Sequence, residues 1–170
     1  REVKTYGNYC YVVCDDGGST GFQIFDMSTL PATVTLVSSN QNLFRRGHAC
    51  WVDDNKLYVS GVTYSTGNTP ATSSMDVYSL ATPSAPVLLR RLSQDYPSIT
   101  YVHDEFVRND TVFASCGNQR LYVYKYNSTQ WNLYINEQNL TQGNYTYFAC
   151  AKDAFQENCT DVRSVKASGF

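Results

Sequence analysis

The fold of this 170-residue chain can be predicted from one segment, His103-Asp-Glu-Phe-Val-Arg-Asn-Asp-Thr-Val-Phe113-Ala-Ser-Cys116. A short run of strand-forming residues leads into the polar turn Arg108-Asn-Asp110, and a second run begins at Thr111. Asn and Asp tolerate the positive backbone angles that a tight hairpin requires. The stretch therefore predicts a β-hairpin.

The same pattern occurs twice more upstream, without gaps. One copy is His48-Ala-Cys-Trp-Val-Asp-Asp-Asn-Lys-Leu-Tyr58-Val-Ser-Gly61, and the other is Arg1-Glu-Val-Lys-Thr-Tyr-Gly-Asn-Tyr-Cys-Tyr11-Val-Val-Cys14. In each copy an aromatic residue of the second strand lies ten positions after the start. The copies begin 47 and then 55 residues apart, a spacing typical of stacked structural repeats.

Two further strands are predicted after each hairpin. Third strands are expected at 21–26, 74–79 and 119–125, and proline-marked links lead to fourth strands at 33–37 and 87–92. Four antiparallel strands per repeat are the pattern of a β-propeller blade. We therefore predict an all-β fold of antiparallel four-stranded blades, with blades at about 1–47, 48–102 and 103–136.

The first 126 residues resemble the LVIVD repeat, which occurs in β-propellers of extracellular and surface-anchored proteins of the choice-of-anchor B type. The resemblance rests on Asn8-Tyr-Cys-Tyr-Val-Val-Cys14 with Phe22-Gln-Ile-Phe-Asp26, and on His103-Asp104 with Phe113-Ala-Ser-Cys-Gly-Asn-Gln-Arg-Leu-Tyr-Val-Tyr124. It implies three propeller blades and an extracellular or surface location. The segment 137–170 departs from the pattern, and we expect it to be a partial fourth blade or a glycosylated tail.

Three or four blades do not close a propeller, which usually has about 4–8. An open fan would leave strand edges unpaired and inner faces wet. The chain begins at Arg1 without a signal-peptide pattern, so a mature product, an excised piece or part of a longer chain is expected. The expected partners are the remaining blades of a longer chain or other copies of this one.

Glycosylation acceptors and cysteines indicate the secretory route. Thirteen Asn and 16 Thr would give about one Asn-x-Thr triplet by chance. The chain has five, at Asn109, Asn127, Asn139, Asn144 and Asn158. The six cysteines are an even number, as disulfides require, and the expected pairs are Cys150–Cys159 first and Cys10–Cys50 second. We predict a secreted, extracellular or cell-surface protein, the alternative being that a Thr-rich composition produces meaningless triplets.

Several partner classes are not expected. The net charge of −2 provides no positive surface for nucleic acid, and no apolar run reaches the ~18 residues of a membrane span. The cysteines lack C-x-x-C spacing and only two histidines are present, so no metal or cofactor is predicted.

The two histidines are the candidate chemical residues. His48 and His103 occupy the same position of the repeat, so the favoured interpretation is structural. Together with Asp104, they are predicted to mark the start of the second and third blades and to hydrogen-bond backbone groups of the neighbouring blade. A catalytic triad would need a base beside a nucleophile, and no catalytic residue is predicted.

The sequence as a whole predicts a secreted glycoprotein that is not an enzyme. Its blades would form a structural or binding scaffold for protein or glycan ligands in an extracellular assembly or fibre. Exposed aromatic contact residues are expected among Trp51, Trp131, Tyr134 and Tyr145, although blade packing explains most of them. The alternatives are a propeller hydrolase or lyase with catalytic residues largely on other blades, and a β-sandwich module.

Overall fold

The structure is a computed structural model that describes residues 2–16, 21–65, 67–68, 70–116 and 121–136, and the strands within 143–167. After residue 133 only the backbone is described. The chain divides into two compact units, Arg1–Asn136 and Glu137–Phe170. The described elements are strands, apart from one 3-10 helix at Leu92–Gln94, so the predicted all-β class is confirmed.

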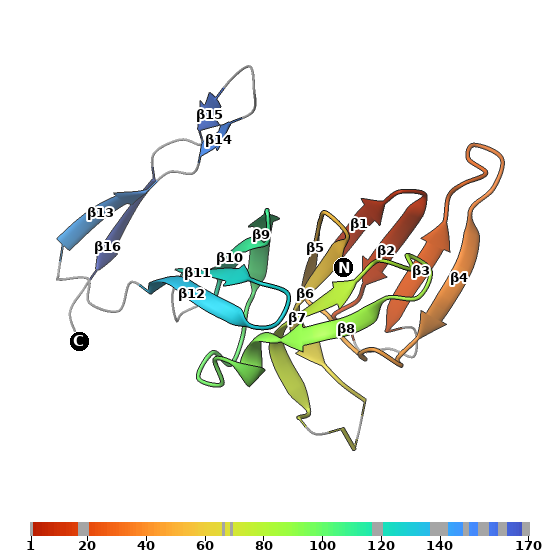
Figure 1. Cartoon of the computed structure of the whole chain (residues 1–170), viewed down its shortest axis with the longest axis horizontal. Coiled ribbons are helices and arrows are strands. Elements are labelled where there is room, and N and C mark those ends of the chain that lie inside the picture. Colours follow the sequence, from red (N-terminus) through yellow and green to blue (C-terminus); the bar gives the residue numbers. More distant parts are fainter. Residues whose placement is uncertain are drawn as a thin grey trace. The chain divides into compact units, whose positions relative to one another are not determined.

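Three antiparallel four-stranded sheets make up the first unit (Figure 1). Sheet 1 contains β1 (Glu2–Tyr6), β2 (Tyr9–Val13), β3 (Phe22–Asp26) and β4 (Thr35–Asn40). Sheet 2 contains β5 (Ala49–Asp53), β6 (Lys56–Thr63), β7 (Thr72–Ser79) and β8 (Val87–Arg91). Sheet 3 contains β9 (Asp104–Arg108), β10 (Thr111–Ser115), β11 (Leu121–Tyr126) and β12 (Trp131–Asn136). Strands pair in chain order in every sheet, which confirms the predicted four-stranded repeat.

The first hairpin of each sheet has a two-residue turn. Tyr6 pairs with Tyr9, Asp53 with Lys56, and Arg108 with Thr111. The turns contain left-handed residues, with φ of +55° at Gly7, 52° at Asp54 and 51° at Asn109. Gly, Asp and Asn adopt this region at low cost, which confirms the turns predicted from the repeat.

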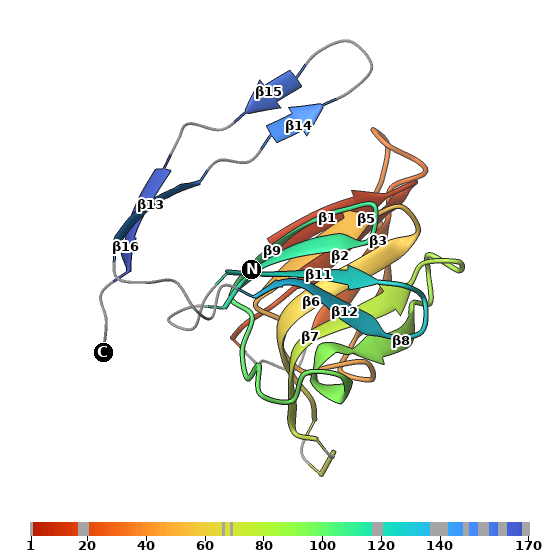
Figure 2. The same ribbon diagram turned by 60° about the vertical axis from the view of Figure 1, so that its left-hand side comes forward.

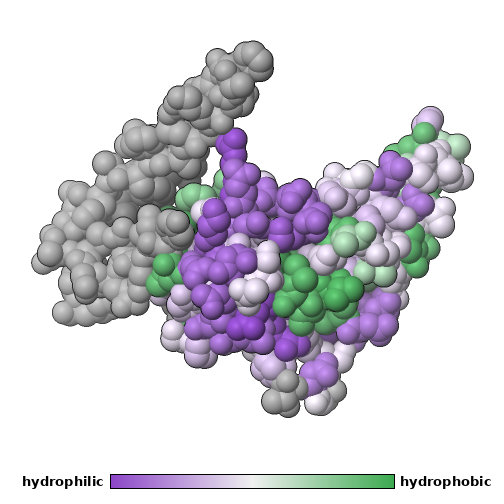
Figure 3. Space-filling view, in the orientation of Figure 1, coloured by the Kyte–Doolittle hydropathy of each residue, from purple (hydrophilic) through white to green (hydrophobic). Residues whose placement is uncertain are grey.

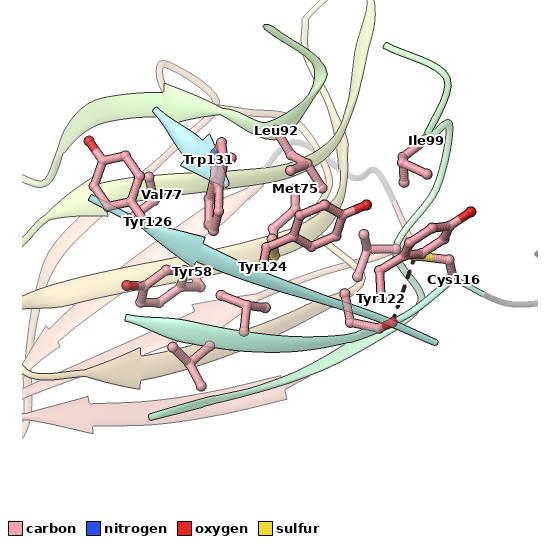
Figure 4. Close-up of a cluster of buried hydrophobic side chains, with 14 residues drawn as sticks. Tyr58, Met75, Val77, Leu92, Ile99, Cys116, Tyr122, Tyr124, Tyr126 and Trp131 are labelled. Atoms are coloured by element: carbon pink, nitrogen blue, oxygen red, sulfur yellow. Dashed lines mark hydrogen bonds between the residues drawn. The ribbon is translucent and has the colours of Figure 1, made fainter. Parts of the chain in front are cut away.

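Two hydrophobic layers hold the three sheets together. Tyr11, Val13 and Ile24 of sheet 1 pack with Leu57, Val59 and Tyr78 of sheet 2. In the second layer, sheet 2 meets sheet 3 through the residues drawn in Figure 4, which include Tyr58, Met75, Val77, Tyr124 and Trp131. Successive side chains of a strand point to opposite faces, so Leu57 enters one layer and Tyr58 the other.

One row of side chains repeats from sheet to sheet. Cross-strand pairing aligns it as Lys4–Tyr11–Ile24 in sheet 1, Trp51–Tyr58–Val77 in sheet 2 and Phe106–Phe113–Val123 in sheet 3. The first row faces sheet 2 and the second faces sheet 3. In the third row Phe106 is 44% exposed and Phe113 is 39% exposed. The face that is buried twice is therefore partly open on sheet 3, although Val123 of the same row is only 7% exposed.

The first strands of the three sheets lie together, in both Figure 1 and Figure 2. Glu2 on β1 accepts a hydrogen bond from the Cys50 N–H on β5 at 2.7 Å. Lys4 pairs with Glu2 and lies 4.9 Å from the centre of the Trp51 ring, which in turn contacts the Phe106 ring on β9 at 5.0 Å. Side chains of β1, β5 and β9 thus join the sheets along one line.

The structure corrects one expectation about exposed aromatics. Trp131 is only 2% exposed, because it points into the layer between sheets 2 and 3 (Figure 4). Trp51 is partly buried beside the same layer. Tyr134 and Tyr145 have side chains outside the described part of the chain.

The second unit has two short antiparallel pairs. β13 (Gly143–Tyr147) pairs with β16 (Arg163–Ala167), and β14 (Cys150–Lys152) pairs with β15 (Glu157–Cys159). Because β14 and β15 lie between β13 and β16 in the chain, the two pairs follow the order of one long hairpin with a break in each arm. Its described strands form no four-stranded sheet like those of the first unit.

Candidate functional site

The two histidines of the chain stand at equivalent places in the fold, one residue before β5 and one before β9. The His48 N–H donates to the Ser60 carbonyl at 2.8 Å, and the His103 N–H donates to the Ser115 carbonyl at 2.7 Å. Each bond extends the first strand pair of its sheet by one residue. The imidazoles therefore leave the backbone at matching points of adjacent sheets.

The two side chains meet directly. Their Nε2 atoms are 3.3 Å apart and their ring centres 4.5 Å apart. His48 Nδ1 lies 2.8 Å from an oxygen of Asp15, which follows β2 of sheet 1. An ionised carboxylate only accepts hydrogen bonds, so His48 donates its Nδ1–H to Asp15, and the Nε2 of a neutral His48 then accepts from His103. A hydrogen-bonded chain, Asp15–His48–His103, thus links all three sheets.

A tyrosine and a glycine complete this cluster. The Tyr101 ring centre lies 5.9 Å from that of His48 and 6.2 Å from that of His103. Partial burial, with the nearby Asp15 charge, raises the pKa of Tyr101. Gly61 has φ of +59°, and a Cβ there would lie 2.7 Å from the Cβ of His48 and 2.9 Å from Tyr101 Cε2. The glycine therefore makes the room in which these rings sit.

Gly61→Ala is expected to lower the free energy of unfolding by about 2–4 kcal/mol, because it combines a left-handed alanine with a backbone-proximal clash. Gly7→Ala is the matched control: φ is +55° there, and nothing lies within 4 Å of the added Cβ. The control should lose only about 1 kcal/mol. Urea denaturation measures both, and equal losses would mean that the space beside His48 is not constrained.

Solvent reaches the cluster. The His48 side chain is 28% exposed and that of Asp15 is 49% exposed, while His103 and Tyr101 are exposed residues. A ligand or ion can therefore reach the imidazole nitrogens without a rearrangement of the fold. Chemically, the cluster offers an oriented hydrogen-bond acceptor, a donor and an aromatic ring.

The sequence-based interpretation of the histidines needs correction in one respect. Their described side-chain partners are Asp15 and each other, not backbone groups of the next sheet. Asp104 does not join them, because its carboxylate accepts the Glu105 N–H at 2.8 Å. Sequence reasoning missed Asp15, since its partner lies 33 positions away and no local pattern connects the two.

A buried carboxylate on β9 was also missed. Glu105 is 4% exposed, and neither of its carboxylate oxygens has a hydrogen-bond partner. Burial, followed by the charges of Asp104 and Glu2, raises its pKa well above the usual value. Asp76 on β7 contrasts with it: burial raises its pKa, but Tyr64 and Tyr78 donate hydroxyl hydrogen bonds to it at 2.5 and 2.8 Å.

The predicted glycosylation sites are placed as follows. Asn109 is exposed in the β9–β10 turn, and Asn127 is exposed after β11, where its side-chain oxygen accepts from the Thr129 N–H at 3.1 Å. Asn144 and Asn158 lie in β13 and β15, with side chains outside the described part, and Asn139 lies outside it altogether. Glycosylation at all five stays a prediction.

Of the two expected disulfides, one stays a prediction and the other is wrong. Cys150 and Cys159 are register partners in the β14–β15 pair, so their backbones lie opposite one another, and the bond itself stays a prediction. Cys10 and Cys50 are free thiols, so the second expected pair is wrong for this structure. The reason is strand alternation: Tyr11 faces sheet 2, where Cys50 lies, so Cys10 points to the opposite face.

Within the described ranges, no three or more His, Cys, Asp or Glu side chains gather into a metal site. No helix in the same part of the chain is long and apolar enough to cross a membrane. Comparison with protein-family models, with characterised proteins and with solved structures found no match.

Proposed function

We propose that this chain supplies three consecutive blades of a β-propeller and works as a secreted binding scaffold. The main support is that the equivalent face of sheets 1 and 2 packs on the next sheet along the chain. The Tyr11 row packs on sheet 2 and the equivalent Tyr58 row packs on sheet 3. Four-stranded sheets repeated around an axis are the plan of a propeller, and the meeting of β1, β5 and β9 supplies its inner strands.

Both ends of this stack have open apolar faces. Phe106, Phe113 and Leu121 are exposed on sheet 3, on the face that sheets 1 and 2 bury. At the other end, Val3 and Leu36 of sheet 1 are 52% and 51% exposed. They lie on the face that corresponds to the Leu57 face of sheet 2, which packs on sheet 1.

The two open faces are therefore a complementary pair, and each fits a further blade of the same kind. Those blades come from a longer chain or from other copies. Copies would associate head to tail, forming a ring if the rotation closes and a filament if it does not. The edge strands add apolar surface, as Figure 3 shows over β8, where Val87 and Leu89 are exposed.

A scaffold role follows from this arrangement. The inner faces of the sheets bury side chains in the layers between sheets, so the turns and the ends of the sheets remain for contacts with ligands. The exposed Asn109 and Asn127 sequons support a secreted glycoprotein. Glycosidase treatment of the protein isolated from its source should lower its mass, and an unchanged mass would remove the case for secretion.

A hydrolase or lyase is the second candidate, favoured by the Asp15–His48 pair. The pair is like a general base and the carboxylate that orients it. A base needs a nucleophile or a water at its free nitrogen, however, and His103 occupies that position beside His48. A hydrolytic activity that the unchanged chain has and the His48→Gln variant lacks would favour the enzyme over the scaffold.

A charge on the open face of sheet 3 tests the propeller proposal. Phe113→Asp is expected to weaken self-association or blade docking at least ten-fold, because the carboxylate would enter an apolar interface. Leu30→Asp is the control, since Leu30 is exposed in the β3–β4 loop and lies in no strand of either open face. Sedimentation equilibrium of the full glycosylated chain measures the difference.

A further inference from the structure

The separation of the two histidine nitrogens has a chemical meaning beyond a hydrogen bond. Imidazole nitrogens bind Zn²⁺ at about 2.0–2.1 Å, so two of them on one tetrahedral ion lie about 3.3 Å apart. The Nε2 atoms of His48 and His103 are 3.3 Å apart. The pair therefore already has the spacing of two ligands of one ion.

Asp15 lies where a carboxylate commonly accepts the second N–H of a metal-binding histidine. Metal-ligating imidazoles usually donate their second N–H to a carboxylate or carbonyl, which fixes the tautomer and the ring orientation. Asp15 accepts from His48 Nδ1 at 2.8 Å, which leaves the Nε2 lone pair available. His103 needs only to move its proton from Nε2 to Nδ1 to become the second ligand.

The fold holds both rings firmly but leaves them accessible. Each backbone is fixed by an equivalent hydrogen bond, to Ser60 and to Ser115. His48 and Tyr101 occupy the space that a side chain at position 61 would fill, so Gly61 allows both rings to lie there. His48 is partly exposed and His103 exposed, so an ion from solution can enter.

We propose that His48 and His103 together bind one first-row transition-metal ion through their Nε2 atoms, with Asp15 as a positioning residue. Imidazole suits Zn²⁺, Cu²⁺ and Ni²⁺. In the part of the chain that the structure describes, no third His, Cys, Asp or Glu joins the pair, so the other coordination positions take water or a donor group of a bound ligand. The proposal does not depend on the number of blades.

The competing interpretation is a structural hydrogen bond between the two rings. It needs no ion, and it predicts that the pair ignores added metal. The two interpretations also differ at Asp15: a metal site loses affinity when the orienting carboxylate is removed, whereas a structural bond changes only stability.

The test uses the full chain without a polyhistidine tag, titrated with Cu²⁺ and followed by electron paramagnetic resonance, with Zn²⁺ calorimetry in parallel. One ion per chain is expected, with nitrogen couplings from two imidazoles. His48→Gln and His103→Gln should each weaken binding at least 100-fold and remove one nitrogen coupling. Asp15→Asn should weaken it about 10–100-fold with both couplings kept.

Asp54→Asn is the control, since it removes the same charge from an exposed turn at the opposite end of β5 from His48 and should leave binding unchanged. Circular dichroism establishes that each variant is folded, and if His48→Gln does not fold, the exposed His103 decides the question alone. Absence of stoichiometric binding overturns the proposal. Binding that survives in His103→Gln also overturns it, because other groups, such as the free thiols, would then hold the ion.

Discussion

Replacing Trp131 with alanine is expected to lower the free energy of unfolding by about 3–5 kcal/mol. The side chain is 2% exposed and lies between sheets 2 and 3. Its ring centre is 6.1 Å from that of Tyr58 on sheet 2 and 5.2 Å from that of Tyr126 on sheet 3. Alanine would leave a cavity in the layer that attaches sheet 3.

Urea denaturation followed by far-ultraviolet circular dichroism measures this loss without relying on tryptophan fluorescence. Trp131→Phe is the control, because it keeps an aromatic ring in the layer and should lose less than half as much. A loss below about 1 kcal/mol for the alanine variant would mean that the layer does not hold sheet 3 to sheet 2.

Replacing Glu105 with methionine is expected to have the opposite effect and to stabilise the protein at pH 7 by about 1–3 kcal/mol. The carboxylate is buried without a hydrogen-bond partner for either oxygen, and an unsatisfied buried acceptor costs about that much. Methionine has a similar shape, so it removes the polar cost and fills the same space beside Ala114, which lies in the layer between sheets 2 and 3.

The stability of the unchanged protein should also depend on pH through Glu105. Burial and the neighbouring Asp104 and Glu2 charges raise the pKa of Glu105 in the fold. Above the unfolded value of about 4.3, the folded chain keeps a proton that the unfolded chain has lost. Stability therefore falls as the pH rises from there towards the raised pKa.

Denaturation curves from pH 4 to pH 8 measure this dependence. Glu105→Met should lack the contribution, so its advantage over the unchanged chain should widen as the pH rises. Asp54→Asn changes an exposed turn carboxylate and should leave the slope as it is. Identical slopes in the unchanged chain and Glu105→Met would contradict the burial of an unpaired carboxyl group.

The repeating part of the fold could be predicted from the sequence because its information is local. The left-handed turn at Asn109 and Asp110 needs residues of that type, and the aromatic residues Tyr11, Tyr58 and Phe113 recur at a fixed offset from it. Hairpins of this kind are specified by adjacent residues. The predicted third and fourth strands match β3, β4, β7, β8 and β11 with boundaries within three residues, whereas β12 was not predicted.

The candidate site could be predicted only in part. The shared repeat position singled out His48 and His103, but Asp15 joins them across 33 positions, and no periodicity encodes such a contact. Burial was the other difficulty. Glu105 looks like a surface residue by type, and its place between sheets depends on strand direction and stacking order. Strand alternation was overlooked for Cys10: Tyr11 faces sheet 2, so the expected Cys10–Cys50 pair was wrong.

The propeller proposal requires that the open faces of sheets 1 and 3 receive further blades. The most direct measurement is the mass of the protein from its source, in its native state and after removal of glycans and reduction. We predict a native particle of several chains, or a polypeptide heavier than 19.1 kDa that carries the other blades. A lone 19.1 kDa chain that stays monomeric at all concentrations, with Phe106 and Phe113 exposed to water, would contradict the claim.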